Sequence, residues 1–264
     1  MVANVNHPIA AKASFKRHAS VAQKGSRSRQ SRLRFALLAP LLLLVALPLL
    51  MLLLSWVRVD AEVWSHLGQH LLPRLIGHSL LLMLCVGAGV LLLGTGLAWL
   101  AACCEFPGRR WFDPLLVLPL AFPAYVLAFI YLGLLDFAGP VQTALRALFG
   151  ATPAWLDALS GPYGVIPILV LALFPYVYLL ARASFASGGM VAFEAGRSLG
   201  ESPLRVFFRI SLPAARPAIV AGLALALMET LADFGAVATF GLETFTTAIY
   251  RTWLGMFDLQ AATQ

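Results

Sequence analysis

Two acidic residues lie inside an apolar stretch of the sequence. Glu229 and Asp233 are four residues apart in the apolar block 217–239, so a helix would place both carboxylates on one face. The small residues expected on that face are Ala218, Gly222, Ala226 and Ala236. The bulky residues expected mostly elsewhere are Ile219, Val220, Leu223, Leu227 and Phe234.

A carboxylate at mid-membrane depth costs about 2.5–3.5 kcal/mol, so such groups normally face the inside of a helix bundle or a water-filled cavity. We therefore expect this face to point inward. Two roles are open for the acids: packing elements that are hydrogen-bonded or protonated, or the lining of a pathway that favours a cation. The pathway role is favoured for Asp233, which lies nearer the outer end.

Other patterns that could do chemistry are weak or missing. His66 and His70 have a spacing that could present two imidazoles to one metal ion, but no further ligand pattern completes a site, and we expect none. The cysteines, Cys85, Cys103 and Cys104, also lack zinc-site spacing. No G-x-x-x-x-G-K-[ST], H-E-x-x-H or G-x-S-x-G occurs. The chain is therefore expected to have no enzymatic activity and no cofactor.

The composition is that of a membrane protein. Hydrophobic residues make up 60% and charged residues 12% of the 264 positions, against roughly 45–50% and about 25% in soluble proteins. The net charge is +7, but eight of the nineteen Lys and Arg residues lie before residue 35. That placement indicates membrane topology rather than a nucleic-acid partner.

Five apolar blocks are long enough to cross a bilayer. They cover residues 35–57, 79–102, 114–135, 163–181 and 217–239. The first is 23 residues long, and a cleaved signal peptide has an apolar region of only about 7–15 residues, which favours an uncleaved helix. The sequence thus predicts an all-α polytopic helical bundle.

The basic residues predict the orientation. With the basic tail 1–34 in the cytoplasm, inside segments carry fifteen Lys and Arg residues and outside segments four, as the positive-inside rule requires. Segments 61–76 and 141–159 are expected to be interfacial helices on the outer surface, with Trp64 and Trp155 at headgroup depth. Five spans leave the end of the chain outside, so we expect a sixth span beyond Gln264.

The inside segment 183–216 is long for a connection between two spans. Gly200 is placed where a helix would end on a left-handed residue. Ser202 is a plausible N-cap and Pro203 a first helical residue, which predicts a second short helix from Pro203 toward Ser211. This basic amphipathic helix could lie on anionic lipid or fill a groove on a partner protein.

One stretch of this segment resembles a known signature. Glu194, Ala195 and Gly196 are followed after three residues by Gly200, and after nine more by an I-x-L-P sequence. The residues of that last part are Ile210, Leu212 and Pro213. The pattern resembles the EAA motif of ABC-importer permeases, with Gly196 where the family usually has Ala.

The resemblance extends over about residues 70–264, without the tail and the first span. It implies a type I ABC-importer permease fold, and a helix pair seated in a groove on a cytoplasmic ATPase subunit. It also implies a periplasmic substrate-binding protein, a second permease half, fused or homodimeric, and a location in the bacterial inner membrane.

A finer resemblance concerns residues 229–241 and 244–253, ETLADFGAVATFG and TFTTAIYRTW. They are similar to the corresponding region of ferric-iron permeases, which implies iron(III) as substrate. Permeases for thiamine, polyamines and sulfate share the architecture. An ion-coupled secondary transporter, which would need no ATPase, is the alternative from another class, and a membrane anchor or sensor is a third.

Overall fold

The computed structural model describes residues 38–40, 42–57, 64, 67–189, 193, 195–196, 198–255, 257 and 259–263. The chain divides into two units, residues 1–60 with 263–264, and residues 61–262. In the first unit the helix Leu38–Ser55 buries none of its apolar length. The basic tail 1–34 and His66 lie outside the described residues, as does the side chain of His70.

The described part of the second unit is helical and contains no strand. Its elements are η1 (Leu67–Leu71), α3 (Leu72–Cys103), α4 (Arg109–Val117), η2 (Leu118–Ala121), α5 (Ala124–Leu135), α6 (Pro140–Phe149), α7 (Ala154–Ser160), η3 (Pro162–Gly164), α8 (Val165–Ser184), η4 (Phe185–Gly189), α10 (Pro203–Val206), η5 (Phe207–Ser211), α11 (Leu212–Ala232), α12 (Gly235–Thr239), α13 (Phe245–Tyr250), η6 (Arg251–Gly255) and α14 (Leu259–Thr263). Across the described residues, five helices are long and apolar enough to cross a membrane. The prediction of five spans is confirmed.

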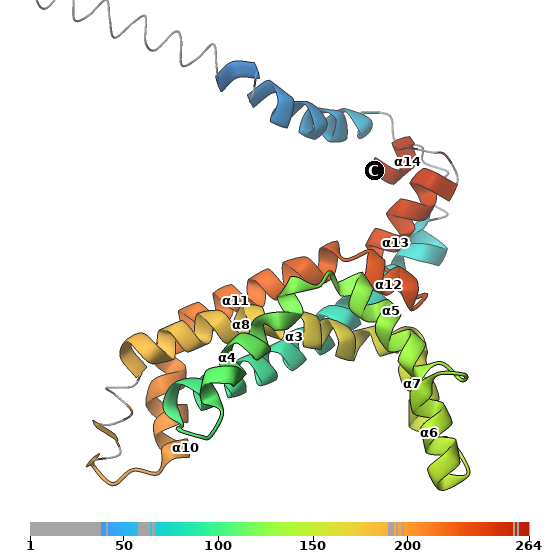
Figure 1. Cartoon of the computed structure of the whole chain (residues 1–264). Helices are drawn as coiled ribbons and strands as arrows, with labels where there is room; N and C mark the ends of the chain where they lie inside the picture. The colour runs from blue at the N-terminus through green and yellow to red at the C-terminus, as the bar shows by residue number, and fades with distance from the viewer. Residues whose placement is uncertain are drawn as a thin grey trace, which may run out of the picture. The chain divides into compact units, whose positions relative to one another are not determined.

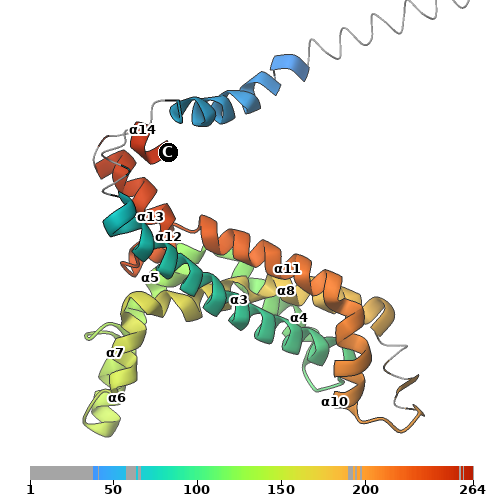
Figure 2. The ribbon, with the colours of Figure 1, turned by 180° about the vertical axis from the view of Figure 1, so that it is seen from behind.

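The core is a layer of three long helices. α3, α8 and α11 run side by side (Figures 1 and 2), and α8 supplies much of the buried surface, including Leu169 and Val177. A Cβ atom added to Gly222 of α11 would lie 2.8 Å from the carbonyl oxygen of Tyr176 on α8. Such close backbone approach is how small residues hold membrane helices together.

Two of the predicted spans are not single helices. The third, predicted over 114–135, is interrupted at Phe122 and Pro123 between η2 and α5, and the helical stretch long enough to cross a membrane there is Ala124–Phe149. The fifth ends as α11 at Ala232, because Asp233 has extended backbone angles (φ −67°, ψ 124°), and α12 follows. Both blocks are apolar enough over their whole length to be predicted as single spans, although Pro123 and Asp233 lie at the interruptions.

Three further expectations need correction. The helix that begins at Pro203 does not stop near Ser211 but continues through η5 and α11 to Ala232. Residues 67–76 are not a separate interfacial helix, since they lead directly into α3. Segment 141–159 forms two short helices, α6 and α7, rather than one.

Candidate functional site

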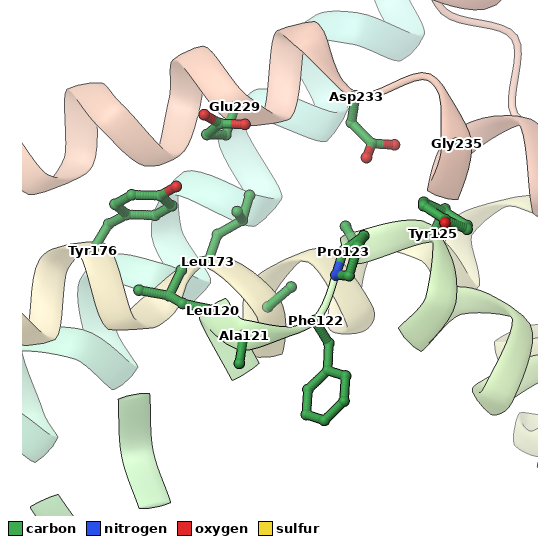
Figure 3. A pocket seen from close by; sticks show the side chains of 12 residues that line it. Leu120, Ala121, Phe122, Pro123, Tyr125, Leu173, Tyr176, Glu229, Asp233 and Gly235 are labelled. Atoms are coloured by element: carbon green, nitrogen blue, oxygen red, sulfur yellow. The ribbon is translucent and has the colours of Figure 1, made fainter. Parts of the chain in front are cut away.

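The two helix interruptions face each other across one cavity of about 420 Å³ (Figure 3). The η2–α5 junction, α8 and the α11–α12 junction line it, and it is open on one side. Its lining residues are Leu120, Ala121, Phe122, Pro123, Ala124, Tyr125, Ala172, Leu173, Tyr176, Glu229, Asp233 and Gly235. The lining contains two carboxyl groups and two phenols but no Lys, Arg or His, so any charge that these side chains give the cavity is negative.

The two acids differ in how they are held. The Glu229 side chain is exposed to the cavity and has no hydrogen bond or ion pair within the described part of the chain. Asp233 is half-buried, and its Oδ1 accepts hydrogen bonds from the backbone N–H groups of Ala236 (2.9 Å) and Val237 (3.1 Å). The Asp233 side chain therefore caps the first turn of α12 from the position before its N-cap residue, Phe234, and also lines the cavity.

The predicted acidic face is correct only in part. Gly222 and Ala226 are buried against neighbouring helices, but Ile219, expected mostly elsewhere, is buried too. α11 contacts both α3 and α8, so it buries a wider face than one stripe. Asp233 does not share a helical face with Glu229, because the helix ends before it.

The capping bond gives a stability prediction for Asp233. Asp233→Asn keeps a side-chain oxygen that can accept from the α12 N–H groups, whereas Asp233→Ala removes it. Loss of an N-cap costs about 0.5–2 kcal/mol. We expect Asp233→Ala to lower the midpoint of thermal unfolding in detergent and Asp233→Asn to leave it nearly unchanged. Equal midpoints for both variants would contradict the capping role.

The predicted turn before α10 is confirmed. Gly200 has a φ of 83°, and the N–H of Glu201 donates to the carbonyl of Gly196 at 3.1 Å, as in the Schellman closure of a helix. The Ser202 side chain accepts from the backbone N–H of Arg205 at 3.4 Å, and Pro203 follows at the first helical position.

The structure explains the glycine that departs from the EAA pattern. Gly196 is buried, and an added Cβ atom would lie 2.7 Å from Cγ2 of Val206 on α10. Ala195 is exposed, and Glu194 lies outside the described residues. The last three residues of the pattern, Ile210, Leu212 and Pro213, lie within the continuous run from η5 into α11.

An aromatic cluster ties this segment to the bundle. The ring of Phe207 in η5 lies 4.9 Å from that of Trp99 on α3 and 6.2 Å from that of Phe185, centroid to centroid. Phe185 is fully buried at the end of α8. The local sequence around Phe207 does not identify these partners, because Trp99 and Phe185 are distant along the chain.

Most of the residues that line the cavity were not predicted from the sequence. Tyr125 and Tyr176 come from different helices, and only the folded arrangement brings them opposite the acids. In the described part of the chain, no group of three or more His, Cys, Asp and Glu residues could hold a metal ion.

Comparisons with known proteins find one family and several relatives. The family described as "Binding-protein-dependent transport system inner membrane component" matches residues 94–262. The Fe(3+)-transport system permease protein FbpB 2 of Haemophilus influenzae is 31% identical over 227 residues, 84% of this chain and 41% of that protein. The molybdenum transport system permease protein ModB of Escherichia coli K12 is 34% identical over 147 residues, 56% of this chain and 62% of that protein.

The chain thus spans about two fifths of the first relative and three fifths of the second. A crystal structure of a bacterial alginate ABC transporter, in complex with a periplasmic protein bound to an alginate pentasaccharide, contains a similar chain. The TM-score is 0.71 at 19% identity, over 89% of this chain and 88% of that one. This likeness shows the fold alone.

Proposed function

The chain belongs to the family of binding-protein-dependent transport system inner membrane components, and we propose that it is the permease subunit of an ABC importer that carries a cation, ferric iron, across the inner membrane. As a permease it is a transport component and not an enzyme. The orientation proposed is the one that the basic residues favour, with the N-terminus in the cytoplasm.

The charge of the cavity supports a cationic substrate. Glu229 and Asp233 line it without any basic side chain. A unit charge brought within about 4 Å of a carboxylate gains or loses about 4 kcal/mol at an effective dielectric constant of 20. A dianion such as sulfate would be repelled by both acids, whereas iron(III) would be attracted, and oxygen ligands suit hard cations.

The sequence similarity to an iron(III) permease supports the same substrate as the acidic lining of the cavity. The relative from Haemophilus influenzae carries Fe(3+) in its printed name, and other relatives carry names with other substrates. The cavity is the observation that favours iron among them, because its lining has two carboxylates and no positive group.

Three partners follow from the proposal. An ATPase subunit would bind the inside segment around Gly200, where an exposed turn precedes α10. A periplasmic binding protein would deliver the substrate at the opposite end. A second permease half would cover the cavity side of α11, because an exposed carboxylate such as Glu229 is costly next to lipid.

Uptake by whole cells tests the substrate. A strain that lacks the gene is complemented with the natural full-length chain, and uptake of radioactive iron(III), sulfate, molybdate and thiamine is compared. We expect restored iron uptake and no change for the other three. Restored uptake of sulfate or molybdate, without iron, would overturn the cationic assignment.

A further inference from the structure

Asp113 joins two helices near the end of the bundle that holds the proposed ATPase-binding segment. The Asp113 side chain on α4 accepts a hydrogen bond from the hydroxyl of Tyr178 (2.6 Å, at Oδ1). Its Oδ2 forms an ion pair with Nη2 of Arg182. Both partners lie on α8, so one carboxylate holds α4 at two points.

Besides this polar contact, α4 is attached by a hydrogen bond from Nη2 of Arg109 to the carbonyl of Ala102 on α3 (3.4 Å) and by contacts with α3 and α8. No residue of α4 or η2 is fully buried, although Leu116 and Val117 touch the core. The carboxylate and the guanidinium are 29% and 36% exposed, and ion pairs this open to solvent are worth only about 0–1 kcal/mol. A contact of that strength can break and re-form without unfolding the helices around it.

The guanidinium is also incompletely satisfied. The Nε atom of Arg182 is buried and has no hydrogen-bond partner in the described part of the chain. A buried donor without an acceptor costs free energy. The observed arrangement therefore leaves Arg182 able to gain a hydrogen bond when its surroundings change.

The Asp113–Arg182 contact lies between the segment around Gly200 and the acidic cavity. Arg182 lies one turn before the buried Phe185, which packs on Phe207 of the helical run that starts at Pro203. On the other side, α4 leads through η2 into the residues from Leu120 onward that line the cavity. A displacement of the segment around Gly200 can thus reach the cavity wall through α8 and α4.

We propose that Asp113, Tyr178 and Arg182 form a latch that fixes the cavity wall to α8 in one state of the transport cycle and is released when the ATPase moves the inside segment. The latch rests on the proposed function, because it has no purpose without ATP-driven transport. Asp113 and Arg182 act as positioning residues and do not touch the substrate.

The test measures ATP hydrolysed per iron(III) ion taken up. It uses proteoliposomes that contain the full-length chain with its ATPase and binding protein. Asp113→Asn and Arg182→Gln should each raise this ratio about threefold to fivefold, the factor that corresponds to a loss of ~0.6–1 kcal/mol. The charge swap of Asp113→Arg with Arg182→Asp should return it to within about 1.5-fold of the wild type. Arg110→Gln removes an exposed charge from the same helix and should leave the ratio unchanged.

The amount of ATPase that co-purifies with each variant reports assembly. If a charge variant fails to assemble, Tyr178→Phe, which loses only the hydroxyl, should still raise the ratio. A wild-type ratio in assembled Asp113→Asn and Tyr178→Phe, or a charge swap no better than either single variant, would overturn the latch. A wild-type complex with no ATP-dependent uptake would instead overturn the proposed function.

Discussion

Gly200→Val is expected to abolish most transport while leaving insertion into the membrane intact. The φ of 83° at Gly200 is in the left-handed region, where a non-glycine residue costs roughly 1–2 kcal/mol and a β-branched residue is the least suited. Among the described residues, no atom outside Gly200 and its two chain neighbours lies within 4 Å of an added Cβ, so the expected effect comes from the backbone. We expect initial uptake of iron(III) to fall about tenfold or more at equal membrane abundance.

The matched control is Gly108→Val. Gly108 has a φ of 87° and is equally free of neighbours around an added Cβ, but it precedes α4 rather than α10. Valine at position 108 should therefore cause similar backbone strain, but outside the proposed ATPase-binding turn around Gly200. Uptake by Gly108→Val should stay clearly above that of Gly200→Val. Wild-type uptake by a Gly200→Val protein of normal abundance would show that the turn is not needed for coupling.

Glu229→Gln should lose iron uptake without losing assembly. The substitution keeps the size of the side chain and removes the charge of the cavity acid whose side chain, unlike that of Asp233, has no hydrogen bond or ion pair within the described chain. Without that attraction, we expect uptake of iron(III) to fall at least ~10-fold. Glu229→Gln combined with Asp233→Asn should fall further, because the combination leaves the cavity lining without any carboxylate.

The control for charge is Glu105→Gln, an exposed acid outside the spans. Its uptake and the ATPase activity of its complex should match the wild type. If the double variant of Glu229 and Asp233 transports iron(III) as the wild type does, the acids are packing elements only. Lost uptake together with lost co-purification of the ATPase would also count against a pathway role.

Local features of this chain were predictable from the sequence. The five spans follow from the length of the apolar blocks, and the turn at Gly200 with its Ser202 cap follows from residue types that favour those backbone conformations. Each of these depends on neighbours within a few positions along the chain. The acids at 229 and 233 were also identifiable, because charge is rare in such blocks.

Features that depend on packing were not predictable. The interruption at Asp233 needs its carboxylate to bind the N–H groups of the next helix, which an apolar pattern does not reveal. Tyr176 and Asp113 acquire their roles only through partners far away in sequence, such as Glu229 across the cavity and Arg182 on α8. Neither residue type reveals which distant residue is its partner.

The most direct test of the assignment as an ABC-importer permease is to measure which energy source drives transport. Proteoliposomes that contain the full-length chain, its ATPase and its binding protein are supplied with radioactive iron(III), and accumulation is measured with ATP, without ATP, and with only a proton or sodium gradient. If the chain is an ABC-importer permease, accumulation should require both ATP hydrolysis and the binding protein. The Glu229→Gln variant should accumulate less iron(III). Accumulation driven by an ion gradient in the absence of the ATPase would contradict this assignment and would identify the chain as a secondary transporter.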